Sequence, residues 1–267
     1  MQPVIKWAGS KRSQAKTIAS MIPSHRRYFE PFVGGGSIVY TMGPDDGVCG
    51  DVCAPLIDLY NEIKAKPAVV LAQYRSEWDV LQRVGQDHFY VVRDRFNANQ
   101  NPQDLLFLSR TCVNGLIRFN AKGEFNNSFH LSRPGIHPDR LGRIIADWSE
   151  RLQNTTFLHG DYADTTQGVS SEDFVYLDPP YANTVGRYQG TSTIDFAEFF
   201  EWLGHLNSKE VMWALSFDGL RGDKSYDSSV PTELYQRKLM LDSGHSSFRR
   251  VMGGSLEPVK EALYLNY

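Results

Sequence analysis

The segment from Arg27 to Asp51 constrains the fold of this 267-residue chain more than any other. A short, largely aromatic run from Arg27 to Phe32 leads into three consecutive glycines, Gly34 to Gly36, and a second apolar run ends at Asp51. This order of strand, glycine turn, helix and strand predicts an α/β unit. Glycine at the turn also lets the backbone approach a ligand closely.

The remaining chain predicts an α/β fold that is interrupted by helices. From about Leu56 to Asn99 the periodicity is helical, with Phe89, Val92 and Phe96 on one face. Further helical patterns at 105–110 and 141–152 flank a loop-rich stretch. Apolar runs at 174–177 and 211–217 are typical of strands, and we expect two more strands at 246–252 and 261–267, joined by a loop with Gly and Pro. We expect one α/β domain from residues 1–56 and 150–267, with an inserted segment at 57–149.

Basic residues are concentrated in two stretches, although the composition is ordinary for a soluble globular protein. The formal net charge is −3, yet residues 1–30 carry six Lys and Arg against one Glu, and residues 110–143 carry six against two acidic residues. Such stretches fit a surface that faces phosphates, and ordinary solvated surface charge is the alternative.

Cysteine usage and hydropathy limit the cellular context. Cys49, Cys53 and Cys112 are odd in number and form no paired CxxC ligand set, so neither a disulfide framework nor a zinc site is indicated. The N-terminus lacks the pattern of a signal peptide, and no run approaches about 18 apolar residues. We expect a cytoplasmic protein of a bacterium, an archaeon or a phage-infected cell, with no membrane span.

The glycine turn has the features of a nucleoside site. Asp51 ends the second strand 17 residues after Gly34, where a carboxylate can accept both hydroxyls of a ribose. The dinucleotide fingerprint G-x-G-x-x-G fails because Val39 replaces its third glycine, which argues against a nicotinamide dehydrogenase. A nucleoside without a pyrophosphate, such as S-adenosylmethionine, suits the turn better, and a turn with no ligand is the alternative.

A second constellation, Asp178-Pro179-Pro180-Tyr181, follows the buried run FVYL directly. Two prolines stiffen the turn and push the preceding residue out of helical geometry. The Asp carboxylate and nearby carbonyls then form a cluster of acceptors beside an aromatic ring. An exocyclic amino group on a flat base needs acceptors for its N–H groups and a ring to stack upon. An ordinary Pro-Pro turn is the alternative.

Four motifs, in this order, resemble the Dam family of DNA adenine-N6 methyltransferases. KWAGSK at 6–11 is similar to the family's N-terminal KWAGGK, and EPFVGGGS at 30–37 matches its cofactor motif. NGLIRFNAKGEFN at 114–126 resembles the recognition-hairpin segment, and DPPY at 178–181 matches the catalytic motif. The match spans nearly the whole chain.

The resemblance implies a Rossmann-like methyltransferase sheet with an inserted, mainly helical DNA-recognition domain that contains a β-hairpin. Residues 1–56 and 150–267 would be the catalytic domain that binds S-adenosylmethionine, with no metal required, and 57–149 the target-recognition domain. The residues implied to bind the cofactor are Trp7, Ala8, Gly9, Lys11, Glu30, Phe32, Gly34, Gly36, Asp51, Asp161, Tyr162 and Asp178.

The resemblance also implies roles at the target base and on DNA. Asp178, Pro179 and Pro180 would form the catalytic turn that holds the amino group, and Tyr181 would stack on the flipped adenine. The residues implied to contact DNA are Lys6, Arg93 or Arg95, Asn114, Leu116, Arg118, Asn120, Asn126 and Ser128.

The sequence therefore predicts a site-specific, base-flipping adenine-N6 methyltransferase that acts on double-stranded DNA. Asn114, Leu116 and Arg118 favour GATC as the site, whereas Val113 and Ser128 differ from residues common in the family. Alternatives are a DNA-binding protein without catalysis and a methyltransferase of cytosine N4 or RNA adenine. A cognate restriction endonuclease is left open as a partner, and a monomer is the default expectation.

Overall fold

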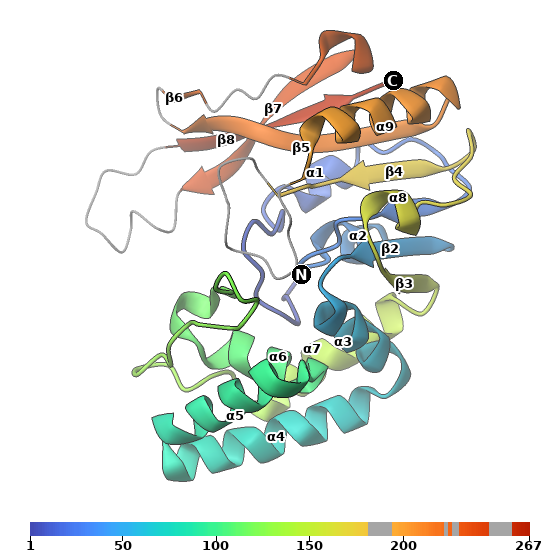
Figure 1. The fold of residues 1–267 in the computed structure, drawn as a ribbon. Helices are drawn as coiled ribbons and strands as arrows, with labels where there is room; N and C mark the ends of the chain where they lie inside the picture. The colour runs from blue at the N-terminus through green and yellow to red at the C-terminus, as the bar shows by residue number, and fades with distance from the viewer. Residues whose placement is uncertain (181–193, 222–223, 226–229, 246–257) are drawn as a thin grey trace.

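The computed structural model describes residues 1–180, 194–221, 224–225, 230–245 and 258–267 (Figure 1). The strands of the described chain are β1 Tyr28–Glu30, β2 Gly47–Asp51, β3 Thr155–His159, β4 Phe174–Leu177, β5 Met212–Arg221, β6 Lys224–Ser225, β7 Arg237–His245 and β8 Pro258–Leu265. The α-helices are α1 Ala15–Ala19, α2 Ser37–Met42, α3 Ala54–Ala65, α4 Pro67–Val84, α5 Gln86–Asn99, α6 Pro102–Thr111, α7 Pro138–Arg151, α8 Tyr162–Thr165 and α9 Phe196–Ser208. Two short 3-10 helices complete the set, η1 Val113–Gly115 and η2 Thr232–Leu234.

The strands of the described residues form one sheet in the order β3-β2-β1-β4-β5-β8-β7, with β6 paired to β5. Strands β1 to β5 run parallel, and β8 pairs antiparallel with both β5 and β7. The strand order reverses between β1 and β4, and ligands of open α/β sheets bind outside the carboxyl ends of strands at such a point. The predicted α/β class and Rossmann-like sheet are confirmed.

The sheet is buried on both faces at β4, as the continuous apolar run FVYL requires. In β4, Phe174 and Tyr176 pack into a core with α1, α2 and α3, whereas Val175 and Leu177 pack into a second core with α9. This alternation is the period of two expected for a strand. Each such fully buried side chain contributes about 1.5–3 kcal/mol relative to leaving it exposed.

The inserted stretch folds into helices that lie at one end of the molecule, away from most of the sheet (Figure 1). Phe89, Val92 and Phe96 of α5 are fully buried, so the predicted helical face is the packed face. Asn101 caps α6 by accepting hydrogen bonds from the amides of Gln103 and Asp104. The helical character of the insertion is therefore confirmed, whereas the domain boundaries at 57 and 149 remain a prediction.

The expected hairpin at 114–126 is held by isolated antiparallel bridges, Phe119 with Phe125 and Cys112 with Phe129. Asn120 replaces part of the ladder, because its side-chain oxygen accepts hydrogen bonds from the amides of Lys122 and Glu124. The two arms of the loop run antiparallel, as in a hairpin, but they do not form a regular two-stranded ladder.

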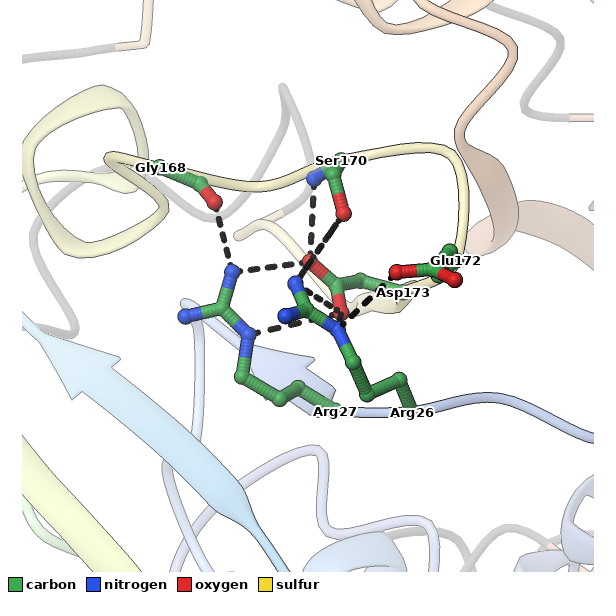
Figure 2. Close-up of polar contacts among 6 residues, drawn as sticks. All are labelled: Arg26, Arg27, Gly168, Ser170, Glu172 and Asp173. Atoms are coloured by element: carbon green, nitrogen blue, oxygen red, sulfur yellow. Dashed lines mark hydrogen bonds and ion pairs between the residues drawn. The ribbon is translucent and has the colours of Figure 1, made fainter.

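A buried carboxylate ties the amino ends of β1 and β4 together. Asp173, which precedes β4, accepts hydrogen bonds from the guanidinium groups of Arg26 and Arg27 and from the amide and hydroxyl of Ser170 (Figure 2). Burial alone raises the pKa of Asp173, but the hydrogen bonds from Arg27, Ser170 and Arg26 outweigh it and hold the pKa at about 2. Arg27 also donates to the carbonyl of Gly168, so the turn before β4 is fixed from both sides.

We predict that Asp173→Asn lowers the free energy of unfolding by about 2–4 kcal/mol at pH 7, because it leaves two arginines without their carboxylate. The pKa of Asp173 is depressed from 3.8 to about 2. Its contribution is therefore present above pH 3.8 and lost as the pH falls toward 2. Urea unfolding of both proteins across this range measures the difference, which should shrink in acid.

Glu172→Gln is the matched control, because Glu172 is largely exposed and pairs with Arg26 only at 3.5 Å. Exposed ion pairs contribute at most about 1 kcal/mol. Equal losses in the two variants at pH 7 would contradict the special role of the buried carboxylate.

Candidate active site

The glycine turn after β1 is shaped by a tryptophan from the N-terminal segment. Gly34 has a φ of +43°, and a Cβ there would lie 2.9 Å from Cδ1 of Trp7. The hydroxyl of Tyr60 donates to the carbonyl of Gly34 at 2.8 Å, and the ring of Trp148 lies against Gly36. The turn is therefore packed so closely that only glycine fits at Gly34.

Asp51 lies at the carboxyl end of β2 and holds the turn through its carboxylate. Its two oxygens accept hydrogen bonds from the amides of Gly34 and Cys53, each at 3.0 Å. Burial raises the pKa of Asp51 to about 6, while the two amides oppose that rise. A carboxylate has about four lone-pair directions, so Asp51 can still accept two hydroxyl groups.

Glu30 ends β1 beneath the turn, with 2% of its surface exposed. Its Oε2 accepts hydrogen bonds from the hydroxyl of Tyr28 and from the amide of Val39, both at 2.8 Å. Burial raises the pKa of Glu30 to about 8, so the group carries a proton at neutral pH. These contacts make Glu30 a support for the turn and for the start of α2.

Phe32, which follows β1, and Tyr162, which begins α8, are half-buried aromatic side chains that pack together. The rings of Phe32 and Tyr162 lie 5.8 Å apart, and Tyr162 packs edge-on against Phe199 and Trp202. Asp161 caps α8 by accepting hydrogen bonds from the amides of Ala163 and Asp164, which fixes the adjoining Tyr162. A flat, apolar surface of this kind suits a purine ring.

Asp178 follows β4 and forms an ion pair with Lys11. The distance from Nζ of Lys11 to Oδ1 of Asp178 is 2.7 Å, and the Lys11 side chain is only 4% exposed. Burial raises the pKa of Asp178 to about 6, against the opposing effect of the Lys11 ammonium. The resemblance places Lys11 among the cofactor contacts, whereas the structure places its ammonium on the carboxylate of the DPPY motif.

The other residues of that motif are placed only in part. Pro179 is buried and Pro180 is half-buried, directly after Asp178. Tyr181 lies outside the described residues, so its predicted stacking role remains a prediction. Ala8 is half-buried and Gly9 is exposed, and the carbonyl of Gly9 accepts a hydrogen bond from Lys11 at 3.3 Å.

Lys6 connects the N-terminal segment with the loop of the insertion. Its aliphatic stem covers Gly115 so closely that a Cβ at Gly115 would collide with it. Partial burial, and secondly the charge of Arg110, lower the pKa of Lys6. The guanidinium of Arg110 is itself buried and donates to the carbonyls of Pro3 and Val4, which anchors the segment.

The residues that the resemblance assigns to DNA differ in their surroundings. Asn114, Arg118, Asn126 and Ser128 are exposed along the loop that follows α6, and Leu116 is half-buried.

A hollow between α5 and the loop is lined partly by predicted DNA contacts. Arg93, Asn120 and Asn126 line it together with the acidic side chains of Asp94 and Glu124. Arg93 also lies over the ring of Tyr90 and pairs with Asp94. The structure therefore brings three of the predicted contacts to one surface.

Arg95 points into a network inside the insertion instead. Its guanidinium pairs with Asp104 at 2.5 Å and with Glu77 at 2.8 Å, and Glu77 also contacts His88. These carboxylates raise the pKa of Arg95, chiefly through the Asp104 hydrogen bond. The network favours a structural role for Arg95 and leaves Arg93 as the better of the two candidates for DNA contact.

Three site residues were not predicted from the sequence. Tyr60 and Trp148 pack against the glycine turn, and Glu261 of β8 lies 3.6 Å from Nζ of Lys11. Tyr60 and Trp148 carried a signal only as apolar helix positions, which do not reveal what they pack against. Glu261 was visible only as a charged residue in an apolar strand.

The family model that matches residues 7–240 is that of the D12 class N6 adenine-specific DNA methyltransferases. This chain belongs to that family. The match covers the turn, the insertion and the DPPY motif together. No described helix is long and apolar enough to cross a membrane, and among the described residues no group of three or more His, Cys, Asp or Glu is placed to hold a metal ion.

Individual relatives agree with the family model. The chain is 30% identical to a DNA adenine methylase of Serratia marcescens over 85% of this chain and 80% of the relative. It is 31% identical to the type II methyltransferase M.MjaIII of Methanocaldococcus jannaschii over 73% and 75%, respectively. The DNA adenine methylase of Escherichia coli K12 is 32% identical over 67% of this chain and 64% of the relative.

We predict that Gly34→Ala lowers the free energy of unfolding by about 3 kcal/mol, because it combines a left-handed backbone with a collision against Trp7. Gly168→Ala is the control, since Gly168 has a φ of +75° but open space around its Cα. Backbone strain alone should cost about 1 kcal/mol there. Unfolding in guanidinium chloride measures the free energy of unfolding of both variants. Equal losses of stability would contradict the close approach of Trp7 to Gly34.

Proposed function

We propose that this enzyme transfers a methyl group from S-adenosylmethionine to N6 of an adenine that is flipped out of double-stranded DNA. One observation carries the proposal: the glycine turn, Asp51 and Asp178 meet at the carboxyl edge of β1, β2 and β4, where the strand order reverses. A nucleoside site and a cluster of amino-group acceptors are thereby adjacent. Membership of the family supports the same reaction.

The residues at the turn fit the cofactor. Asp51 is placed to accept the ribose hydroxyls, the Phe32 and Tyr162 rings to pack against the adenine, and the turn beside Trp7 to admit the methionine part. S-adenosylmethionine supplies an electrophilic methyl group on a positively charged sulfur.

Asp178 supplies the acceptor for the amino group. The lone pair of an exocyclic amino nitrogen is delocalised into the ring, so the nitrogen is a poor nucleophile. Hydrogen bonds from its N–H groups to Asp178 and to the carbonyl of Pro179 favour a pyramidal nitrogen with a localised lone pair. The nitrogen would form a bond to the methyl carbon as the sulfur–methyl bond breaks, with S-adenosylhomocysteine as the leaving group. The nitrogen loses one proton, which the Asp178 carboxylate accepts.

Base flipping brings the amino nitrogen within reach. Extrusion of a base costs a few kcal/mol, and stacking on Tyr181 would offset about 1–3 kcal/mol of it. The loop that carries Asn114, Arg118 and Asn126 is exposed on the side of the insertion, and its contacts would select the sequence. GATC is the proposed site.

The molecular setting is part of the proposal as well. Relatives carry the names DNA adenine methylase and type II methyltransferase, and a type II methyltransferase acts beside a restriction endonuclease. We propose a cognate restriction endonuclease as a partner, whose gene would lie near that of this enzyme. We also propose that a monomer acts on DNA. Methylation of cytosine N4 or of RNA adenine is the competing reaction.

Methylation mapping tests the function directly. Purified protein and S-adenosylmethionine are incubated with unmethylated genomic DNA, and the modified bases are located by sequencing. We expect N6-methyladenine within one short motif. Methylcytosine, or methylation of RNA alone, would contradict the proposal.

We predict that Asp178→Asn lowers the methylation rate at least about 100-fold, because the amide removes both the charge and the proton acceptor. Cofactor binding, measured by calorimetry, should remain within about threefold of the wild type. Asp58→Asn, which changes an exposed carboxylate of α3, should leave both quantities unchanged. Retained turnover in Asp178→Asn would remove Asp178 from the reaction.

We predict that Arg118→Ala relaxes discrimination at one base pair of the site, because an arginine reads guanine through two hydrogen bonds worth about 1–3 kcal/mol. Rates on substrates with single-base changes measure the loss. Lys122 lies in the same exposed turn, and if it contacts phosphate, Lys122→Ala should lower the affinity for all of these DNA substrates by the same factor. An unaltered preference in Arg118→Ala would exclude Arg118 from base recognition.

A further inference from the structure

Three charged groups from distant parts of the chain meet beside the catalytic turn. Nζ of Lys11 lies 2.7 Å from Oδ1 of Asp178 and 3.6 Å from Oε2 of Glu261. The Lys11 side chain is 4% exposed, and each carboxylate side chain is 20% exposed. Glu261 reaches the site from β8, which pairs with β5, the neighbour of β4.

The placement of Glu261 is energetically costly by itself. Its Oε2 is buried and has no hydrogen-bond partner among the described residues. A buried carboxylate oxygen without hydrogen bonds loses its hydration and is stabilised only by nearby charge. Lys11 is the cation with which Glu261 forms an ion pair, so this position of Glu261 serves the electrostatics of Lys11 rather than the packing of β8.

The charge balance of the cluster depends on the second carboxylate. Lys11 and Asp178 alone form a neutral pair, in which the ammonium occupies Oδ1 and lowers the acceptor strength of the whole carboxylate. With Glu261 ionised, the three groups carry a net charge of −1. The ammonium is then shared between two carboxylates, and Asp178 retains more of its capacity to accept a hydrogen bond.

We propose that Glu261 is a positioning residue: it shares the Lys11 ammonium with Asp178 and thereby leaves Asp178 more able to accept a hydrogen bond from the amino group that is methylated. The proposal rests on the proposed role of Asp178 in the reaction. Glu261 acts through Lys11, with which it forms an ion pair.

The other charged and titratable neighbours act on Asp178 in known directions. Burial raises its pKa to about 6, Lys11 lowers it, and Glu261 raises it. Glu30 of β1 and Tyr176 of β4 are also close enough to interact electrostatically with Asp178. Because Glu30 carries a proton at neutral pH, Glu261 is the neighbouring carboxylate whose charge decides the acceptor strength.

The test is Glu261→Gln, which removes the charge and keeps the shape. Loss of a nearby negative charge favours the ionised form of Asp178, so its pKa should fall by about 1 pH unit. Carboxyl carbon-13 NMR of the protein without DNA measures this titration. The weaker acceptor should lower kcat about 3- to 10-fold with an unchanged KM for the cofactor, and the acid limb of the kcat profile should move to lower pH.

Two variants complete the experiment. Glu261→Asp keeps the charge, so it should retain most of the wild-type kcat and the wild-type titration of Asp178. Glu233→Gln makes the same chemical change at an exposed site in η2 and should alter neither kcat nor the pKa of Asp178. An Asp178 pKa that does not move in Glu261→Gln overturns the proposal, even if activity is lost, because that result leaves only a structural role.

A folding failure of Glu261→Gln would not leave the question open. Glu261→Leu then removes the charge with an apolar side chain at the same strand position. An Asp178 titration in that variant identical to that of the wild type overturns the proposal. Since this titration needs no substrate, it stands apart from the methylation map: a protein that modifies no adenine refutes the proposed function and leaves the NMR result intact.

Discussion

The pairing of β1 with β4 is the constraint on which the rest of the structure depends. Asp173 and the two arginines fix the amino ends of these strands, and the register Tyr28 with Phe174 and Phe29 with Val175 follows. Because both strands are short, a slip of one residue would reverse which side chains face each core. The carboxyl ends then deliver the glycine turn and Asp178 to the same edge.

The chemistry at that edge arises from burial rather than from unusual residues. The pKa values of Glu30, Asp51 and Asp178 are raised to about 8, 6 and 6, in each case chiefly by loss of hydration. Their neighbours differ, and this difference separates their tasks. Burial favours the neutral form of Glu30 against the hydrogen bonds from Tyr28 and Val39, whereas the Lys11 ammonium favours the ionised form of Asp178.

Local patterns predicted the elements well because periodicity is a local property. The run FVYL became β4, and the α5 face became a packed face. The segments 30–37 and 178–180 came together because they lie at the carboxyl ends of neighbouring parallel strands. Long-range pairs were beyond such reasoning. Nothing near Arg95 in sequence distinguishes it from Arg93, and only the folded neighbours Glu77 and Asp104 decide its surroundings. Glu261 reaches Lys11 only through the order of β5 and β8.

The loop at 112–129 is a second feature that the sequence pattern predicted only in part. Its residues resemble a hairpin, but the side chains of Asn120 and Asn127 take up backbone donors and carbonyls that a ladder would use. The loop is thereby fixed at its turns, while Arg118 and Asn126 remain exposed.

The ion cluster at Lys11 also has a consequence for biosynthesis. Lys11 is synthesised long before Glu261, which belongs to β8, the strand between β5 and β7. Chains are synthesised from the N-terminus onward, so the charge environment of Asp178 is incomplete until β8 has been made and inserted. A nascent or prematurely terminated chain carries every motif in the cofactor turn and DPPY, yet it lacks the carboxylate that balances Lys11.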